Sequence, residues 1–196
     1  DDYLIIQYEY PVFTHLKGKD LYVRLADGKY DREGFHKRPH EYKCLFLPYA
    51  SVSDILMNGV YWDHTIPRLF SLEDLRSESF QLSVIADITC DENGSVPCNV
   101  GSTTIQDPTY GFDKTTLAKT KPYLSSKDSI DIMAVDNLPN ELPRDASKYF
   151  GGYLQTYVLP DLLHGKNSAI LQRATICANG TLGENYAYLK NYAEVV

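Results

Sequence analysis

The stretch SIDIMAVDN, residues 129–137, decides the fold class because it is an apolar strand that ends in polar side chains. Ile130, Ile132 and Val135 are β-branched, as is typical of strands. The apolar residues form a nearly unbroken run instead of alternating with polar ones. Such runs are typical of parallel strands in a sheet that is covered on both faces.

Two earlier runs have the same character: DILMNGVYW at residues 54–62 and SVIADIT at residues 83–89. Between them, SLEDLRSESF predicts a helix, with Ser71 as the N-cap and Asp74 three residues later. Strands that alternate with helical crossovers predict an α/β protein with a Rossmann-like, doubly wound and mostly parallel sheet. The link over residues 91–128 is too irregular for a simple helical crossover, so it predicts short strands or an elaborate loop.

The flanking regions complete the expected order of elements. Residues 2–10 predict a first strand, and residues 44–49 a short helix. From Pro143 the chain turns helical, with one buried apolar stripe; the adjacent glycines 151 and 152 indicate either close packing against a neighbour or a kink. A further helix is expected to end near Asn179-Gly180, and residues 184–194 to form a short amphipathic helix.

Composition limits the classes of protein to consider. The chain has 196 residues, 43% hydrophobic and 23% charged, which is typical of a foldable soluble domain. Its formal charge of −7 argues against nucleic acid or a membrane surface as partner. The four cysteines (Cys44, Cys90, Cys98 and Cys177) form no CxxC pair and are expected to be reduced thiols. We therefore expect a soluble intracellular protein, cytoplasmic or, if its source is a eukaryote, mitochondrial.

Polar residues follow each of the three apolar runs, over 58–61, 87–91 and 136–138. In open parallel sheets, ligands bind beyond the carboxyl ends of the strands. One such end alone is better explained by Asp and Asn as turn formers, whereas for three coincident ends the two interpretations are equal. The sequence contains no Gly-x-Ser-x-Gly, no Gly-x-x-x-x-Gly-Lys and no Gly-x-Gly-x-x-Gly fingerprint.

Five segments, in this order, resemble the lysine-ketoglutarate reductase domain of the saccharopine dehydrogenase and alanine dehydrogenase superfamily. They are YDREGFHKRPHEYKCLF (30–46), NGVYWDHTIPRLF (58–70), IADITCDENGSV (85–96), AVDNLPNELPRDASKYF (134–150) and RATICANGTLGENYAYL (173–189). The resemblance covers the chain from about residue 20 onward. It implies an enzyme with a Rossmann domain that uses NAD or NADP to form or oxidise saccharopine, by reducing the imine of lysine and 2-oxoglutarate.

The resemblance also implies roles for individual residues. Those expected along the dinucleotide are Tyr61 and Ile88. Those expected around its nicotinamide ribose end are Val135, Asp136, Asn137 and Leu138. Those expected to face the amino-acid or 2-oxo-acid substrate are Thr89, Cys90 and Asp91. Asp136 is the candidate catalytic residue, because imine chemistry needs a proton relay near the hydride path. No metal is expected.

The family's catalytic lysine and histidine, its glycine-rich turn and its NAD/NADP-selecting residue are not found in this sequence. The chain is therefore expected to be the distal half of the cofactor domain, residues 1–142, followed by a C-terminal helical segment, residues 143–196, and to be incomplete for catalysis. Half of a doubly wound sheet exposes an apolar edge, so we expect a homo-oligomer or association with the missing N-terminal part.

Two alternatives stay open at this point. One is another amino-acid dehydrogenase of the same superfamily, acting on alanine or on saccharopine itself. The other is a non-catalytic domain that retains the fold for binding or assembly.

Overall fold

The computed structural model describes residues 10–193 and divides into two compact units, Asp1–Leu138 and Pro139–Val196. The chain enters the second unit through a 3-10 helix, Leu138–Asn140. The assignment of a cofactor-binding part over residues 1–142 stays a prediction. Each unit is described separately below.

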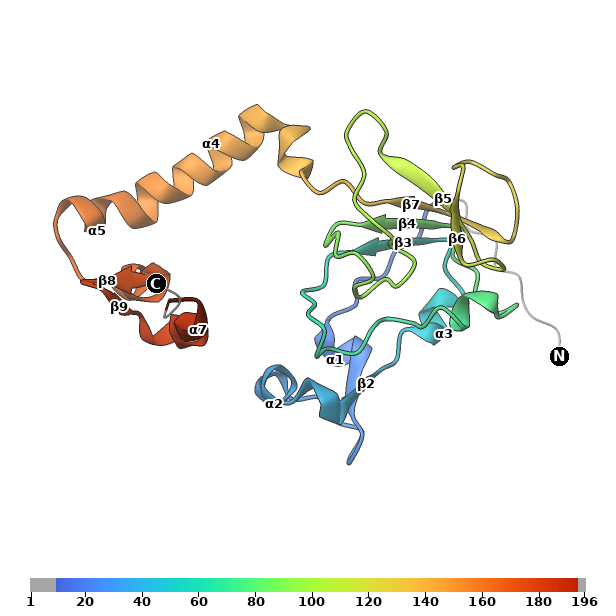
Figure 1. Ribbon diagram of the computed structural model, residues 1–196, viewed down its shortest axis with the longest axis horizontal. Helices are drawn as coiled ribbons and strands as arrows, with labels where there is room; N and C mark the ends of the chain where they lie inside the picture. Colours follow the sequence, from blue (N-terminus) through green and yellow to red (C-terminus); the bar gives the residue numbers. More distant parts are fainter. Residues whose placement is uncertain (1–9, 194–196) are drawn as a thin grey trace. The chain divides into compact units, whose positions relative to one another are not determined.

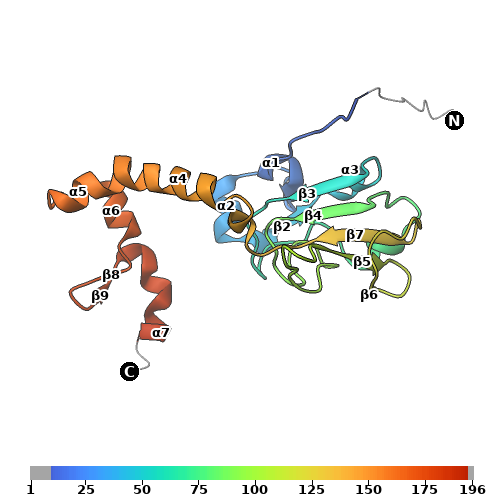
Figure 2. The same cartoon turned by 90° about the horizontal axis from the view of Figure 1, so that it is seen from above.

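The first unit is built on a five-stranded mixed sheet with the strand order β3-β4-β7-β5-β6 (Figure 1). Its strands are β3 (Ile55–Asn58), β4 (Val84–Asp87), β5 (Thr109–Asp113), β6 (Ala118–Thr120) and β7 (Ser129–Met133). The first three neighbours, β3, β4 and β7, are parallel, and β5 and β6 are antiparallel additions on the far side of β7. The three apolar runs therefore lie side by side and point the same way (Figure 2), and the expected α/β class is confirmed.

One face of this sheet carries the core. Leu56 pairs with Ile85, which pairs with Ile132, and Ile85 and Ile132 are fully buried. Tyr110 and Phe112 of β5 continue the same face. Aromatic and aliphatic side chains from the connections cover it: Phe46, Leu69, Phe70, Leu75, Phe80, Leu82 and Val96. Burial of this apolar area supplies most of the stabilisation of the unit.

The opposite face of the sheet is open on β3. Ile55 is 61% exposed and Met57 is 72% exposed, while Leu56 between them is partly buried. The apolar run predicted a sheet covered on both faces; within residues 10–193 this part of the second face has no cover. The residue types on β3 suit a covered sheet, which is why pattern alone could not show which face would be packed.

The connection from β3 to β4 contains no α-helix, so the helix expected over residues 71–80 is wrong. Only one 3-10 turn forms, Asp74–Arg76. The capping box is present: the Ser71 backbone N–H donates to Asp74 Oδ2 at 2.7 Å, and the Asp74 N–H donates to Ser71 Oγ at 3.2 Å. The helix does not continue, because Ser77 is already extended and leads Phe80 into the core. The short strands expected within residues 91–128 are confirmed as β5 and β6.

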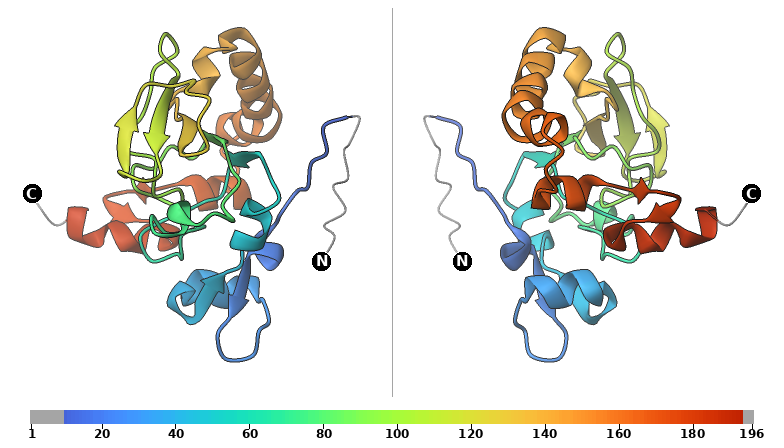
Figure 3. Two further views of the ribbon diagram at one scale, coloured as in Figure 1. Left: turned by 90° about the vertical axis from the view of Figure 1, so that its right-hand side faces the viewer. Right: turned by 90° about the vertical axis from the view of Figure 1, so that its left-hand side faces the viewer.

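A small lobe precedes the sheet. It contains α1 (Gly18–Leu21), β1 (Tyr22–Arg24), α2 (Arg32–Lys37), a 3-10 helix (Pro39–Glu41), β2 (Tyr42–Cys44) and α3 (Leu47–Ala50). The rings of Tyr22, Phe35 and Tyr42 pack together, with centroids 4.6 Å apart for Tyr22–Phe35 and 5.3 Å apart for Phe35–Tyr42. Figure 3 shows this lobe, in blue, at the opposite end of the first unit from the β5–β6 hairpin, in yellow-green.

Two expectations concern this region of the chain. The helix expected over 44–49 is shifted, because Cys44 belongs to β2 and the helical turn begins at Leu47. The strand expected over 2–10 falls on residues that, except for Tyr10, lie outside the described range, and Tyr10 is not in a strand.

The second unit is helical with one small hairpin. It contains α4 (Pro143–Tyr153), a π-helical turn (Leu154–Val158), α5 (Leu159–Leu163), α6 (Ala169–Ala174), β8 (Cys177–Ala178), β9 (Thr181–Leu182), a 3-10 helix (Glu184–Leu189) and α7 (Lys190–Ala193). Pro143 occupies the first helical turn as expected. The expected buried stripe is wrong for the described residues, since Phe150 is 65% exposed and Tyr153 is 51% exposed.

The glycines of this unit also behave differently from expectation. Helix α4 continues through Gly151 and Gly152 to Tyr153, and a Cβ at either glycine would meet nothing within 4 Å, so close packing among the described residues does not explain them. Asn179 and Gly180 do not end a helix, because α6 ends at Ala174. Their φ values of 51° and 76° instead form the two-residue turn between β8 and β9. Asn-Gly is the preferred pair for such turns.

Candidate functional site

The parallel register brings the three polar strand ends to one edge of the sheet. Asn58 is the residue paired with Asp87, so the last residues of β3 and β4 are direct neighbours. Ala86 is paired with Met133, which places the end of β7 beside the end of β4. The prediction that residues 58–61, 87–91 and 136–138 follow neighbouring parallel strands is therefore confirmed.

A buried polar network joins the ends of β3 and β4. Asn58 Nδ2 donates to Asp87 Oδ1, Thr89 Oγ1 and Ser95 Oγ, each at 2.8 Å. Thr89 Oγ1 donates to Asp87 Oδ1 at 2.9 Å, and Asn99 Nδ2 donates to Asp87 Oδ2 at 2.7 Å. Asn58, Asp87, Ser95 and Asn99 are at most 1% exposed. We call the five hydrogen-bonded residues the strand-end network: Asn58, Asp87, Thr89, Ser95 and Asn99.

The orientation of both amides in this network follows from backbone donors. Asn58 Oδ1 accepts from the Val60 N–H at 3.4 Å, and Asn99 Oδ1 accepts from the Gly101 N–H at 3.1 Å. Each carbonyl oxygen therefore faces a donor, and each NH₂ group faces Asp87. Within residues 10–193, no lysine, arginine or histidine nitrogen lies within 4.0 Å of the Asp87 carboxylate. Amide and hydroxyl donors alone satisfy this buried anion.

The loop after β4 is tied to the end of β7. Cys90 has a φ of 61° in the left-handed region, and its Sγ donates to the Ala134 carbonyl oxygen at 2.7 Å. The Thr103 N–H donates to the same oxygen at 2.8 Å. A non-glycine residue in the left-handed region persists only where surrounding contacts hold it, and it is often found at functional sites. Here the contacts come from β7 and from Thr103.

The electrostatics of this loop are acidic. Partial burial, followed by the charges of Asp87, Asp136 and Asp91, raises the pKa of the Cys90 thiol. Burial and then the charge of Asp87 raise the pKa of the Asp91 carboxyl. Cys90 is therefore a protonated hydrogen-bond donor at neutral pH and is poorly suited to act as a nucleophile. Asp91 retains its proton to a higher pH than an isolated carboxyl does.

The residues predicted for the substrate and for the nicotinamide end follow the adjacent strands β4 and β7. Thr89, Cys90 and Asp91 are partly buried at the end of β4. After β7, Asp136 and Asn137 are exposed, whereas Val135 is only 5% exposed and forms a bridge with Thr103. The side chain of Val135 is therefore part of the packing, and only its backbone could face a ligand.

The residues predicted along the dinucleotide are the most exposed of the set. Tyr61 is 73% exposed and Ile88 is 44% exposed, and in the described part of the chain Tyr61 has no hydrogen bond to the other predicted residues. The loop that carries Tyr61 is nevertheless attached to the loop after β4. Arg68 lies over the Trp62 ring at 6.0 Å and donates to the Asn93 carbonyl oxygen at 2.7 Å.

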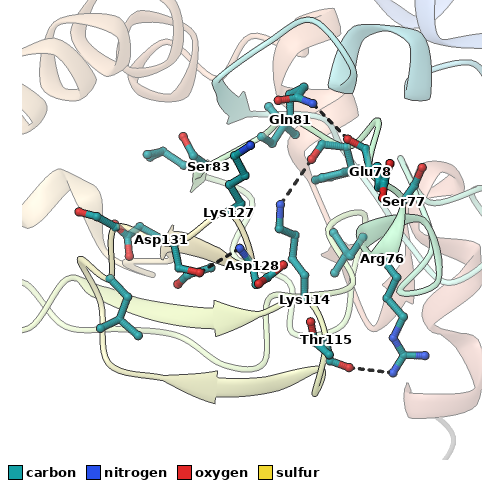
Figure 4. A pocket seen from close by; sticks show the side chains of 18 of the residues that line it. Arg76, Ser77, Glu78, Gln81, Ser83, Lys114, Thr115, Lys127, Asp128 and Asp131 are labelled. Carbon is teal, nitrogen blue, oxygen red and sulfur yellow. Dashed lines mark hydrogen bonds between the residues drawn. The ribbon is translucent and has the colours of Figure 1, made fainter.

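A cavity of about 1200 Å³ lies at the other end of the strands, not beside the predicted site (Figure 4). Ser83 and Val84, where β4 begins, and Ser129, where β7 begins, line it. Lys114 also lines it; burial lowers the pKa of its amine, which donates to the Phe80 carbonyl oxygen at 3.4 Å. Ser129 Oγ is buried and has no hydrogen-bond partner. The cavity contains none of the predicted site residues.

Neither a metal cluster nor a membrane-spanning helix is found within residues 10–193. No group of three His, Cys, Asp or Glu side chains is placed to hold a metal ion, and the four cysteines are free thiols. No helix in this range is long and apolar enough to cross a membrane.

Sequence reasoning identified the strand ends but not the strand-end network. Asn58 and Asp87 were visible as the polar ends of two runs, whereas Ser95 and Asn99 gave no signal, since a serine and an asparagine in a loop are ordinary turn residues. Their role depends on burial against Asp87, which the sequence does not display.

No family model matches the chain. Among curated proteins, it is 30% identical over 200 residues to "Alpha-aminoadipic semialdehyde synthase, mitochondrial" of Mus musculus, covering 88% of this chain and 21% of that protein. It is 32% identical over 177 residues to "Alpha-aminoadipic semialdehyde synthase" of Arabidopsis thaliana, covering 82% of this chain and 16% of that protein. It is also 32% identical over 118 residues to "Saccharopine dehydrogenase [NAD(+), L-lysine-forming]" of Emericella nidulans, covering 59% of this chain and 28% of that protein. The chain thus spans about a fifth of the length of the mouse relative.

Proposed function

Because the chain belongs to the saccharopine dehydrogenase superfamily by its similarity to these relatives, we propose that it is a portion of an NAD(P)-dependent oxidoreductase of lysine metabolism. The reaction is the formation or oxidation of saccharopine, a CH–NH oxidoreduction in which hydride and a proton reduce the imine of lysine and 2-oxoglutarate to the secondary amine of saccharopine. The names of the animal, plant and fungal relatives support this assignment.

The observation that carries the proposal is the parallel pairing of β3, β4 and β7. It gathers three polar strand ends at one edge of a Rossmann-like sheet. In open α/β sheets this edge is where nucleotides and substrates bind. The turn-former interpretation of Asp and Asn accounts for a single end, but it does not account for a buried network that connects two of them.

The described residues fit the nicotinamide half of a dinucleotide better than its phosphates. A phosphate site needs a glycine-rich turn at a helix N-terminus, which this sequence does not contain. We assign Tyr61 and Ile88 to contacts along the dinucleotide, and residues 135–138 to its nicotinamide ribose end, with Val135 contributing backbone only. A bound nicotinamide would supply the hydride donor or acceptor. The NAD(+) in the name of the fungal relatives supports such a cofactor, and NADP remains the alternative.

The chain's own contribution to the chemistry is binding and proton transfer. Thr89, Cys90 and Asp91 face the amino-acid or 2-oxo-acid substrate, with the protonated Cys90 thiol as a donor. Asp136, exposed at the end of β7, adjusts proton transfer near the reacting carbon. Imine reduction needs a proton at nitrogen, so a carboxylate beside the hydride path is chemically appropriate.

The proposal extends to partners and location. The substrate is a small molecule, and neither nucleic acid nor a membrane is a partner. The open face of β3, with Ile55 61% and Met57 72% exposed, supports association with a second copy or with the remainder of a longer enzyme. We place the protein inside the cell, in the cytoplasm or in the mitochondrion, the latter being the location in the name of the mouse relative.

The test is a titration and an assay with the longest natural polypeptide that contains this chain. NADH and NADPH are titrated separately, and oxidation is then followed with lysine plus 2-oxoglutarate and, in parallel, with ammonia plus pyruvate. We expect dinucleotide binding and turnover with the first substrate pair. Turnover with the second pair alone would show an alanine dehydrogenase activity in place of saccharopine chemistry. Binding of neither dinucleotide would support the alternative of a non-catalytic domain.

Asp136 provides a residue-level test in the same polypeptide. Asp136→Ala should lower turnover while leaving the melting temperature nearly unchanged, because the side chain is exposed and its removal leaves no buried group unpaired. Asp145→Ala, at an exposed position in α4, is the control. Wild-type turnover combined with a lowered melting temperature would make Asp136 a turn former.

A further inference from the structure

We infer that Asn58 and Asp87 are positioning residues for the proposed site: together they set the place and the electrostatic surroundings of the Thr89–Asp91 loop. This inference deepens the proposed function and rests on it. Neither side chain can touch a substrate, since each is 1% exposed, so their action must pass through the loop.

Hydrogen bonds from Asn58 and to Asp87 fix the position of the Thr89–Asp91 loop. Asp87 is the last residue of β4, and Thr89, two residues later, donates to its carboxylate at 2.9 Å. Asn58 donates to both of them at 2.8 Å from the neighbouring strand. The next residue, Cys90, has to hold a left-handed backbone conformation. A shift of the Asp87 carboxylate therefore shifts Thr89 and the strained residue after it.

The network continues from Asp87, through Asn99, to β5. Asn99 donates to Asp87 Oδ2 at 2.7 Å, and the Tyr110 hydroxyl donates to Asn99 Oδ1 at 3.2 Å. Tyr110 belongs to β5, two strands away from β4, so three strands of the sheet share this hydrogen-bonded layer. A layer anchored at several points holds its members within the small tolerance that catalysis requires.

The charge of Asp87 adds a second effect. Four titratable groups face it, and its charge raises the pKa of each, after burial: Cys90, Asp91, Cys98 and Tyr110. One cation contacts a member of this layer: Lys119 Nζ lies 4.5 Å from the centroid of the Tyr110 ring. No cation contacts Asp87 itself within residues 10–193, so its charge acts on the loop without a paired counter-ion.

Asparagine at position 58 suits this role better than other residues of its size. Its NH₂ group, which has two N–H donors, lies 2.8 Å from three acceptor oxygens and shares its hydrogens among them, while its carbonyl oxygen accepts from the Val60 N–H. Aspartate would place a second carboxylate against Asp87, and leucine would leave three acceptors without their shared donor.

The first experiment measures proton binding and requires no activity. The pH titration of Asp91 is followed by NMR in the 196-residue chain, in the wild type and in Asp87→Asn. We expect the pKa of Asp91 to fall in the variant, because one of the two causes that raise it has been removed. An unchanged Asp91 titration in a folded Asp87→Asn variant would overturn the electrostatic part of the inference.

The second experiment separates position from stability, using steady-state kinetics in the longest natural polypeptide. Asp87→Asn should lower kcat about 100-fold, the loss associated with a misplaced site, while dinucleotide affinity changes little. The exchanged pair Asn58→Asp with Asp87→Asn restores a donor opposite an acceptor. It should recover the melting temperature toward the wild-type value, but not kcat or the Asp91 titration. Ser129→Ala, a buried serine at the other end of β7, is the control that should retain full activity.

The outcomes are distinguishable from failure of the proposed function. If the wild-type polypeptide binds no dinucleotide and turns over no substrate, the proposed function fails, while the Asp91 titration still decides the electrostatic part. If the wild type is active and the exchanged pair recovers kcat as well as stability, the positioning role is wrong. If Asp87→Asn does not fold, Thr89→Val removes one donor from the network, and wild-type kcat in that variant would overturn the inference.

Discussion

The two ends of the parallel strands differ in whether their buried polar groups are hydrogen-bonded. At the carboxyl ends, Asn58, Asp87 and Asn99 are at most 1% exposed, and every one of them is hydrogen-bonded. At the amino ends the chain surrounds a cavity of about 1200 Å³, and a buried hydroxyl, Ser129 Oγ, has no partner. The end that holds the cavity is therefore not the end whose buried polar groups are fully hydrogen-bonded.

This difference is informative about where function lies. A buried carboxylate without a cation is costly, and it persists only when several donors are aimed at it. Asp87 has three such donors, supplied by β3, by its own loop and by the 95–99 turn. In the cavity at the amino ends, the Lys114 amine donates to a backbone carbonyl oxygen, that of Phe80. The energetically costly burial of Asp87 therefore indicates a functional site at the carboxyl ends more strongly than the cavity indicates one at the amino ends.

The largest effect that we expect tests the carboxyl end directly. Asn58→Leu keeps the size of the side chain but removes the donor that serves Asp87, Thr89 and Ser95. It should lower the free energy of unfolding by about 3 kcal/mol or more, because a buried charge and two hydroxyls lose a partner. Urea unfolding followed by circular dichroism measures this loss. Met57→Leu, at a 72% exposed position of the same strand, should change it by less than about 0.5 kcal/mol. Equal effects of the two changes would contradict the contrast between buried and open positions.

A second prediction concerns alkaline pH. Burial raises the pKa of Cys98 from 9.0 to about 12 and that of Tyr110 from 10.0 to about 12. Both groups are neutral in the folded state, whereas the unfolded chain loses these protons above pH 9 to 10. The stabilisation is therefore fully present below pH 9 and is lost as the pH rises toward 12, with a loss of about 3 to 4 kcal/mol from each group.

Thermal unfolding between pH 8 and pH 11 measures this dependence. Cys98→Ala should reduce the pH dependence above pH 9, although it also lowers stability at neutral pH through the small cavity that it leaves. A melting temperature that does not change between pH 8 and pH 11 would show that these groups are not protected from ionisation by the fold.

The smallest effect is expected at the amino end. Ser129→Ala removes a buried hydroxyl that has no hydrogen bond, so it should leave the free energy of unfolding unchanged or raise it by up to about 1 kcal/mol. Chemical denaturation detects a change of this size as a shift of the midpoint at constant slope. A loss of more than about 1 kcal/mol would mean that the hydroxyl has a partner in solution, and the contrast between the two ends would be weaker.

The sequence predicted the parts of this molecule that depend on residue type along the chain. The three apolar runs correctly indicated neighbouring parallel strands, and Pro143 correctly marked the start of a helix. The predicted helix over 71–80 does not form although its capping box is present. Burial of Leu75 and Phe80 in the core stabilises the extended chain after Ser77 more than the capping box stabilises a helix. Asn179-Gly180 failed because the same pair serves a helix end or a hairpin turn, and only the pairing of β8 with β9 decides between them.

By itself, the sequence determined the α/β class, the polar character of the strand ends and the similarity to enzymes of saccharopine metabolism, since these follow from the order and type of residues. Only the tertiary structure decided that Asn58 and Asp87 face each other, that Ser95 and Asn99 join them, and that Val135 is buried while Asp136 is exposed. The physical reason is that hydrogen bonding and burial depend on the distance between residues far apart in the chain. Ser95 and Asn58 are separated by 37 positions, yet their side chains lie 2.8 Å apart.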